Sequence, residues 1–197
     1  MTVAQILQYG SRIRPCQGER VSGDAVIIKR LDDGLLCAIV DVLGHGAEAH
    51  ELTHVIDAYL ARFSSADVAG VLSRLHRHLT GTRGAAVGVC AIDAGAGQLS
   101  YAGIGNTSMR RFGADETRMV SRDGVLGQNM RSPHTQTLQL AAGDLVVLYT
   151  DGVSDRFSSE DYPGLALHAP GEVANNIVER FGKNHDDAAC VAVRYQP

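Results

Sequence analysis

The chain has 197 residues, of which 22 are acidic and 18 are basic, so its formal net charge is −4. This balance argues against a nucleic-acid binder that works through a basic face, because such proteins displace counterions with clustered cations. An apolar content of 45% and a charged content of 20% exclude wholesale disorder. The length predicts a single domain, residues 1–197.

We expect neither a signal peptide nor a membrane span. The N-terminal residues lack the basic and apolar segments of a signal peptide. The longest apolar runs are far shorter than the roughly 20 residues of a membrane helix. Four cysteines occur without a C-x-x-C motif, and three of them lie in apolar runs, which predicts buried structural thiols. These features predict a cytoplasmic protein.

The first half of the chain predicts a hairpin followed by two helices. Residues 24–29 and 35–41 are apolar, β-branched runs separated by an Asp-Asp-Gly turn signal. After Gly44-His45-Gly46 the apolar residues recur with a helical period, which predicts a helix of about 18 residues. Its expected apolar face comprises Leu52, Val55, Ile56, Tyr59 and Phe63. A second helix is expected to start near Asp67 and to end at residues 81–84.

The second half predicts several strands, one helix and a final strand. The expected strands cover residues 86–92, 99–104, 108–112, 136–140 and 145–149. A helix is expected over residues 171–181 and a last strand over residues 189–195. The polar stretch 113–132 is interpreted as a substrate-recognition loop or a mobile surface connection. Because strands and helices do not alternate throughout, this order favours an α+β fold, an α-β-β-α sandwich of two antiparallel sheets flanked by helices.

Four aspartates lie where predicted strands begin or end: Asp24, Asp41, Asp151 and Asp186. A carboxylate at the end of a rigid strand can be held in a cleft, and several converging carboxylates need cations to neutralise them. Mg²⁺ or Mn²⁺ suits a shell of carboxylate, carbonyl and water oxygens. The alternative is that each aspartate only stabilises a turn.

These aspartates belong to short motifs that together resemble one family. The motifs are Gly23-Asp24, Val40-Asp41-Val42-Leu43-Gly44-His45-Gly46, Thr150-Asp151-Gly152 and Asp186-Asp187. With Arg83-Gly84-Ala85 and Tyr101-Ala102-Gly103-Ile104-Gly105-Asn106, they resemble the PPM family of metal-dependent serine/threonine phosphatases, in its SpoIIE branch. The resemblance runs over residues 18–195 and, within this branch, is greatest to short phosphatases that lack a sensor domain.

The resemblance implies a site that holds two Mn²⁺ or Mg²⁺ ions. Asp41 would bridge both ions, Val42 would add its main-chain carbonyl, and Asp151 and Asp186 would hold one ion. Asp24 would act through water bound to the metals, so Asp24 and Asp41 are the expected catalytic residues. A bridging water would attack the phosphate of phosphoserine or phosphothreonine directly.

The resemblance also implies partners. The expected substrates are phosphorylated stressosome proteins of the RsbR and RsbS type. Neither a nucleic acid nor a membrane is expected as a partner, and we expect a monomer.

Several positions depart from the family pattern. Val42 stands where many members have glycine, although only its carbonyl is needed. Leu43 occupies the position of a general-acid histidine in larger relatives, and His45 is nearby but not equivalent. Arg20 lies one position away from the family's phosphate-binding arginine. Asp155 matches an acidic position near the metals in some relatives, where it would contact water, hold a third ion or cap a turn.

A competing motif is the segment His50-Glu51-Leu52-Thr53-His54, which has the H-E-x-x-H pattern of zinc peptidases. Its two histidines would share one helix face, with Glu51 as the base. The extended pattern is absent, because Asp57 and Leu60 replace its glycine and its third histidine. The pair is instead expected on the solvent-facing side of the helix. A further alternative is a pseudophosphatase, a scaffold that keeps the fold without turnover.

Overall fold

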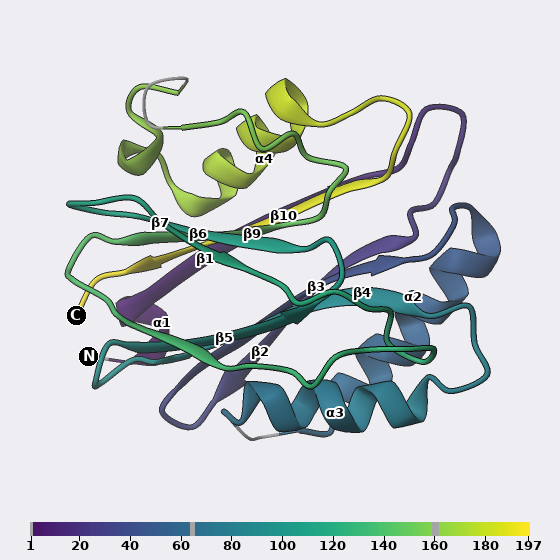
Figure 1. The fold of residues 1–197 in the computed structure, drawn as a ribbon. Coiled ribbons are helices and arrows are strands. Elements are labelled where there is room, and N and C mark those ends of the chain that lie inside the picture. The colour runs from purple at the N-terminus through teal and green to yellow at the C-terminus, as the bar shows by residue number, and fades with distance from the viewer. Residues whose placement is uncertain (1, 64–65, 159–161) are drawn as a thin grey trace.

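Two five-stranded antiparallel sheets face each other in the computed structural model, which describes residues 2–63, 66–158 and 162–197 (Figure 1). The first sheet is ordered β1 (Leu7–Arg14), β10 (Ala188–Tyr195), β9 (Leu145–Tyr149), β6 (Ser108–Phe112) and β7 (Thr117–Val120). The second is ordered β2 (Asp24–Leu31), β3 (Gly34–Val42), β4 (Ala85–Asp93), β5 (Gln98–Ile104) and β8 (Gln136–Gln139).

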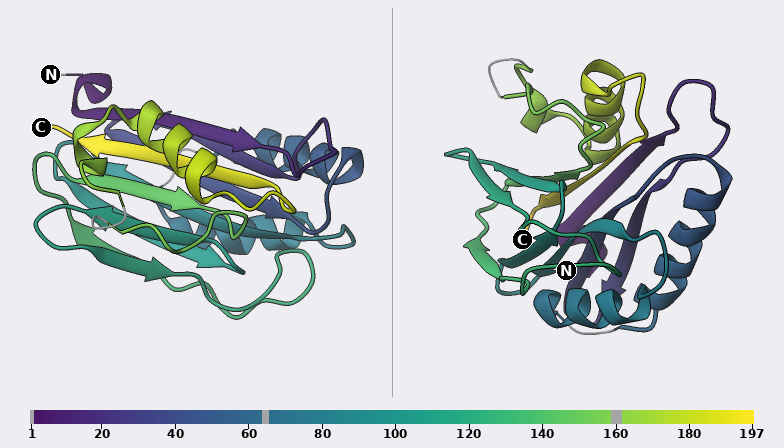
Figure 2. Two further views of the ribbon diagram at one scale, coloured as in Figure 1. Left: turned by 90° about the horizontal axis from the view of Figure 1, so that it is seen from above. Right: turned by 45° about the vertical axis from the view of Figure 1, so that its right-hand side comes forward.

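Helices cover the outer surfaces of both sheets (Figure 2). α2 (Ala47–Leu60) and α3 (Val68–His78) pack on the second sheet, and α4 (Pro170–Phe181) packs on the first. A short α1 (Val3–Ile6) precedes β1, and a 3₁₀ turn, η1 (Leu165–Leu167), precedes α4. The prediction of an α-β-β-α sandwich is therefore confirmed.

The central strands are buried on both faces, which explains their continuous apolar sequences. On β3, one set of alternate residues packs under α2 and α3 and the other set packs between the sheets. The first set is Leu36, Ala38 and Val40, and the second is Leu35, Cys37 and Ile39. β10 divides in the same way between the inter-sheet core and the core under α4.

Two strands are not predicted by the sequence pattern. β1 is an edge strand with mostly exposed side chains, so it lacks the apolar run that marks β3. β7 lies within residues 113–132, which were expected to form only a loop or connection, and it pairs with β6. That expectation is wrong for Thr117–Val120, because four residues of alternating exposure are too few to produce a clear period.

α2 is shorter than the predicted helix of about 18 residues, since it has 14. After Leu60, the amides of Arg62 and Phe63 donate to carbonyls three residues back, so the helix tightens and ends. Val55 was expected on the apolar face but is 45% exposed, because the buried face is centred on Leu52 and Ile56.

None of the helices in the described parts of the chain is long and apolar enough to cross a membrane.

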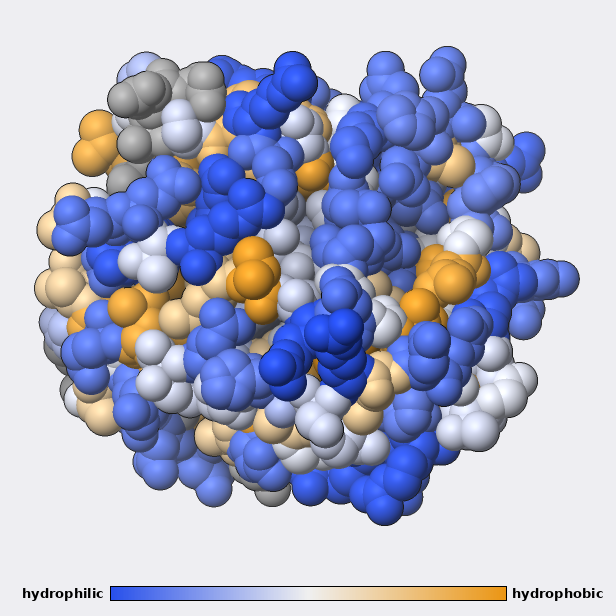
Figure 3. All heavy atoms as spheres, viewed as in Figure 1, coloured by the Kyte–Doolittle hydropathy of each residue, from blue (hydrophilic) through white to orange (hydrophobic). Residues whose placement is uncertain are grey.

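The cysteines lie in the interior, and one face of the surface is mainly hydrophilic. The four cysteines are buried free thiols, as predicted: Cys16, Cys37, Cys90 and Cys190. On the face shown in Figure 3, apolar side chains form small separate groups among hydrophilic ones.

Candidate active site

Asp24 and Asp41 lie side by side at one end of the second sheet. Asp24 is the first residue of β2, and Asp41 is its cross-strand partner near the end of β3. Cross-strand partners project from the same face of a sheet, and like charges in such a pair repel each other. Gly44 and Gly46, with φ of +87° and +77°, then turn the chain from β3 into α2.

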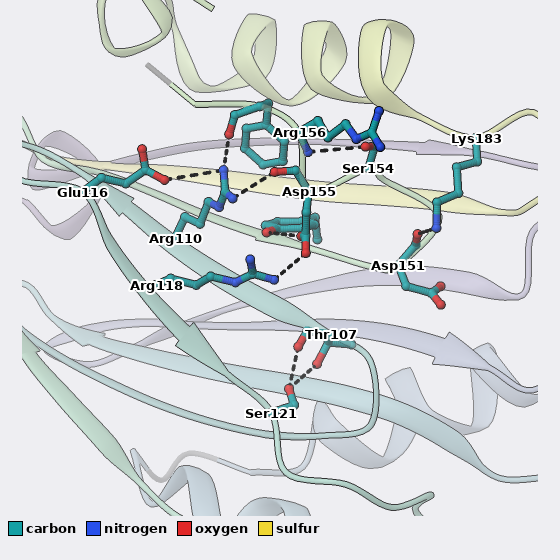
Figure 4. A network of polar contacts seen from close by, with 12 residues as sticks. Thr107, Arg110, Glu116, Arg118, Ser121, Asp151, Ser154, Asp155, Arg156 and Lys183 are labelled. Carbon is teal, nitrogen blue, oxygen red and sulfur yellow. Dashed lines mark hydrogen bonds and ion pairs between the residues drawn. The ribbon is translucent and has the colours of Figure 1, made fainter. Parts of the chain in front are cut away.

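Asp151 and Asp186 come from the first sheet. Asp151 follows the end of β9, and Asp186 precedes the start of β10. The two strands are antiparallel neighbours, with Tyr149 opposite Cys190, so the end of one lies beside the start of the other. The side chain of Lys183 donates to the main-chain carbonyl of Asp151 at 2.5 Å, which fixes this corner (Figure 4).

A cavity of about 460 Å³ brings three of the predicted site residues together: Asp41, Asp151 and Asp186. Asn106, from the connection between β5 and β6, lines the same cavity. The cavity therefore lies where the ends of both sheets meet, and each sheet contributes carboxylates to it.

Thr150 links Asp24 to the other sheet. Its hydroxyl donates to Asp24 Oδ2 at 2.6 Å and accepts a hydrogen bond from the amide of Ala189 at 3.0 Å. Thr150 is fully buried and Asp24 is only 5% exposed. Thr150 thus orients the Asp24 carboxyl group, a role that the sequence analysis missed although the residue stands in the Thr150-Asp151-Gly152 motif.

Burial and mutual repulsion perturb these carboxyl groups. Burial, followed by the charge of Asp151, raises the pKa of Asp41 to about 7, although a hydrogen bond from Asn106 opposes the shift. Burial and the charge of Asp41 also raise the pKa of Asp24 well above its ordinary range. The pKa of Asp186 is raised by burial and by Asp151. Each of these three carboxyl groups is therefore costly to ionise unless a cation lies beside it.

The donor set fits a hard divalent cation. The cavity offers carboxylate oxygens from three aspartates. Val42, which is predicted to give its carbonyl, is buried in the core and does not line the cavity. Within the described residues, no three His, Cys, Asp or Glu side chains are clustered closely enough to hold one ion. An ion here would take one or two carboxylates and complete its shell with carbonyl and water oxygens, as Mg²⁺ usually does.

Asp187 links two segments of the chain through hydrogen bonds. Its Oδ1 accepts from the amide of Cys16 at 2.8 Å, and its Oδ2 accepts from the amide of Gly23 at 2.7 Å. These bonds tie the segment between β1 and β2 to the start of β10. Asp187 was not predicted to be a ligand, and each of its two oxygens accepts a main-chain hydrogen bond in the structure.

Asp155 is likewise committed to protein partners. One oxygen accepts from the Tyr149 hydroxyl at 2.8 Å, and the other contacts the Arg118 guanidinium at 2.5 Å (Figure 4). Partial burial acts to raise the pKa of Asp155, but hydrogen bonds from Arg118 and Tyr149 outweigh it and lower the pKa. Arg110 donates to the main-chain carbonyl of Asp155, so the segment is held at three points.

Two of the positions that depart from the family pattern are His45 and Arg20. His45 lies at the cavity of Asp41, Asp151 and Asp186, and Arg20 does not. His45 and Leu43 both line the 460 Å³ cavity, and His45 Nδ1 is 2.8 Å from Glu19 Oε1. Arg20 lines a different cavity, together with Asp24. Arg83 donates to the Leu43 carbonyl at 3.1 Å and supports the loop that follows Asp41.

The histidines of the H-E-x-x-H segment line the cavity that contains Arg20. His54 is exposed, as expected, but His50 is half-buried, because its Nδ1 bonds to the Ser22 carbonyl at 3.0 Å. Neither histidine lines the cavity of Asp41, Asp151 and Asp186.

Comparisons with known proteins agree with this geometry. The sequence profile of the SpoIIE family, described as Stage II sporulation protein E, matches residues 32–196. The phosphoserine phosphatase RsbX of Bacillus subtilis (strain 168) is 25% identical over 140 residues, which is 70% of this chain and 70% of RsbX.

Solved structures share the fold over almost the whole chain. One, from work on the bacterial stressosome as a modular system adapted to secondary messenger signalling, is 27% identical with a TM-score of 0.88, covering 95% of this chain and 99% of its own. RsbX in complex with magnesium gives a TM-score of 0.82 at 21% identity, covering 98% and 96%. The catalytic domain of the phosphatase PstP with two manganese ions gives 0.73 at 19% identity, covering 98% and 99%. The chain therefore belongs to the SpoIIE family of PP2C-type serine/threonine phosphatases, within the PPM family.

Proposed function

We propose that this phosphatase depends on Mn²⁺ or Mg²⁺ and dephosphorylates phosphoserine or phosphothreonine in signalling proteins of the stressosome type. The observation that carries the proposal is the meeting of Asp41, Asp151 and Asp186, from two different sheets, in one cavity. The likeness to RsbX and to a stressosome-related structure supports the substrate class.

The residues of the site would divide the work as follows. Asp41, between Asp24 and Asp151, would contact both ions, while Asp151 and Asp186 would hold one of them. When bound, two Mn²⁺ or Mg²⁺ ions would activate water and neutralise charge on the phosphoryl oxygens. Asp24 is oriented through Oδ2 by Thr150, and it would accept a hydrogen bond from water at Oδ1. This chemistry needs no serine or cysteine nucleophile.

We further propose that the protein acts in the cytoplasm as a monomer. Four buried free thiols suit a reducing compartment. Apolar side chains in small separate groups on the face of Figure 3 favour a surface that stays in water. Light scattering of the purified protein would check the oligomeric state.

The test uses metal-stripped protein and a phosphoserine peptide. Added Mn²⁺ should restore phosphate release. Asp41→Asn and Asp151→Asn should each lower the rate on the order of 100-fold or more, because Lewis-acid stabilisation is worth several kcal/mol. Asp115→Asn, which removes an exposed carboxylate between β6 and β7, should keep the activity. Full activity in both site variants would contradict the proposal, and peptide binding without turnover at any metal concentration would indicate a pseudophosphatase.

A further inference from the structure

A second cavity, of about 360 Å³, lies between α2 and the segment that leads into β2. Its lining includes His50, His54 and Asp57 from α2, together with Ser22 and Asp24. The carboxylates of Asp41, Asp151 and Asp186 line the other cavity. The proposed phosphatase chemistry uses Asp24 but neither histidine, and neither histidine lines the cavity of Asp41, Asp151 and Asp186.

The imidazoles of His50 and His54 converge. They lie one helical turn apart, their ring centroids are 4.5 Å apart, and their Nε2 atoms are 3.1 Å apart. His50 Nδ1 lies 3.0 Å from the carbonyl oxygen of Ser22. A carbonyl can only accept, so Nδ1 carries the proton and the Nε2 of the neutral His50 ring presents a lone pair.

This arrangement matches the requirements of a borderline transition metal. Two nitrogens at about 2.0–2.1 Å from a tetrahedral Zn²⁺ are separated by roughly 3.3 Å, close to the distance observed here. Imidazole suits Zn²⁺, whereas Mg²⁺ prefers oxygen. A ligating histidine also typically donates its other N–H to a carbonyl or carboxylate, as His50 does to Ser22. A hydrogen bond from His54 to His50 would give the same Nε2 separation without an ion, and the experiment below distinguishes the two.

We propose that His50 and His54 chelate one Zn²⁺ ion, at a site distinct from the carboxylate cavity. In the parts of the chain that the structure describes, no third His, Cys, Asp or Glu completes the group, so water would fill the remaining positions. Two protein ligands are fewer than the three of a catalytic zinc site and the four of a structural one. The site is therefore an exchangeable one and does not support the peptidase alternative.

The site is connected to the start of β2. His50 bonds to the Ser22 carbonyl, and the Ser22 hydroxyl accepts from the amide of Asp24 at 3.0 Å. An ion on the histidines would hold His50 in its present rotamer and would so stabilise this contact between α2 and the segment before β2. Because the ion would bind only the folded chain, it should raise the melting temperature.

In the experiment, Zn²⁺ is titrated into the full chain and its binding is measured by calorimetry. Excess Mg²⁺ is present, because Mg²⁺ favours the carboxylate oxygens of Asp41, Asp151 and Asp186. NMR records the histidine ring resonances. We expect one Zn²⁺ per chain, shifts confined to His50 and His54, and a higher melting temperature. His50→Gln and His54→Gln should abolish all three effects, while His134→Gln, at an exposed histidine elsewhere, should keep them.

The variant Asp41→Asn tests which of the two cavities binds zinc. Zinc binding that persists in this variant and disappears in His54→Gln supports the proposal, even if the proposed phosphatase activity is absent. Zinc binding that is lost in Asp41→Asn but kept in His54→Gln would overturn it. Absence of binding by the wild-type chain would also overturn it and leave the histidine–histidine hydrogen bond as the explanation of the geometry. Circular dichroism without zinc checks that the variants fold.

Discussion

Thr150 shows how a single buried side chain can serve two sheets. Its one hydroxyl donates to Asp24 in the second sheet and accepts from the amide of Ala189 in the first. A buried N–H without an acceptor costs about 1–3 kcal/mol, and a carboxylate without its donor loses its orientation. Thr150 therefore contributes both to stability and to the geometry of the site.

Replacing Thr150 tests both contributions. Thr150→Val keeps the shape but removes the hydroxyl, so it should lower the free energy of unfolding by about 1–3 kcal/mol and reduce phosphatase activity. Thr150→Ser keeps the hydroxyl and should lose much less activity. Denaturant unfolding and phosphate release measure the two effects. Equal activity in the valine and serine variants would show that the hydrogen bond to Asp24 does not matter for catalysis.

At the scale of elements, the contact between α4 and β1 depends on the absence of a side chain. A Cβ atom at Gly10 would lie 2.4 Å from the Cα of Gly171, whereas a Cβ at Gly171 would meet nothing within 4 Å. Of the two glycines at this contact, Gly171 therefore has room for a Cβ atom and Gly10 does not.

The two alanine substitutions should change the free energy of unfolding in opposite directions. Gly10→Ala should lower the free energy of unfolding by about 1–3 kcal/mol, because the strand and helix backbones must move apart. Gly171→Ala should raise it by about 0.4–1 kcal/mol, because the unfolded chain loses freedom and the helix gains a better residue. Thermal or denaturant unfolding of both variants is the measurement. Destabilisation by both would mean that the space beside Gly171 is not open.

The strands buried on both faces were the easiest elements to predict. β9, expected over residues 145–149, was found at Leu145–Tyr149, because burial on two faces leaves a continuous apolar run. β1 and β7 were missed, since strands at a sheet edge need few apolar residues. The end of α2 was missed because its last turn tightens at main-chain carbonyls, which leaves no side-chain signal.

For the site, the sequence located the aspartates but not what holds them. Their places at strand ends follow from local patterns. The bond from Thr150 to Asp24 joins residues 126 positions apart, and that from Gly23 to Asp187 joins residues 164 apart. Such contacts exist only once the two sheets are stacked. The ligand roles of Asp41, Val42, Asp151 and Asp186 stay predictions, as does the role of Asp24 through metal-bound water. The single domain over residues 1–197 also stays a prediction.

Across the whole molecule, the site couples stability to pH and to metal. Burial and the charge of Asp151 raise the pKa of Asp41 from an ordinary value near 3.8 to about 7 in the metal-free folded chain. The folded state therefore holds this proton more tightly than the unfolded state does. The stability it contributes is fully present below about pH 4 and is lost as the pH rises through about 7.

Metal-stripped wild-type protein should therefore unfold at a lower denaturant concentration at pH 8 than at pH 5. Mn²⁺ or Mg²⁺ should restore stability at pH 8, because a cation replaces the proton between the carboxylates. Asp41→Asn should weaken both the pH dependence and the metal effect, and Asp115→Asn should preserve them. Denaturant midpoints at the two pH values, with chelator or with metal, supply the comparison. A metal-free midpoint that is higher at pH 8 would contradict this account.

The pairing of β1 with β10 places the two ends of the chain together and away from the cavity of Asp41, Asp151 and Asp186. Leu7 lies opposite Tyr195, and Gln8 bonds to Gln196 at 3.1 Å. Arg14 and Ala188, at the other end of the pair, are roughly 23 Å away at the rise of an extended strand, beside Asp186. A fluorescent protein or affinity tag fused to either end would thus leave the cavity open. A short linker between the ends would also permit circular permutation, with new termini in the exposed turn at residues 32–33.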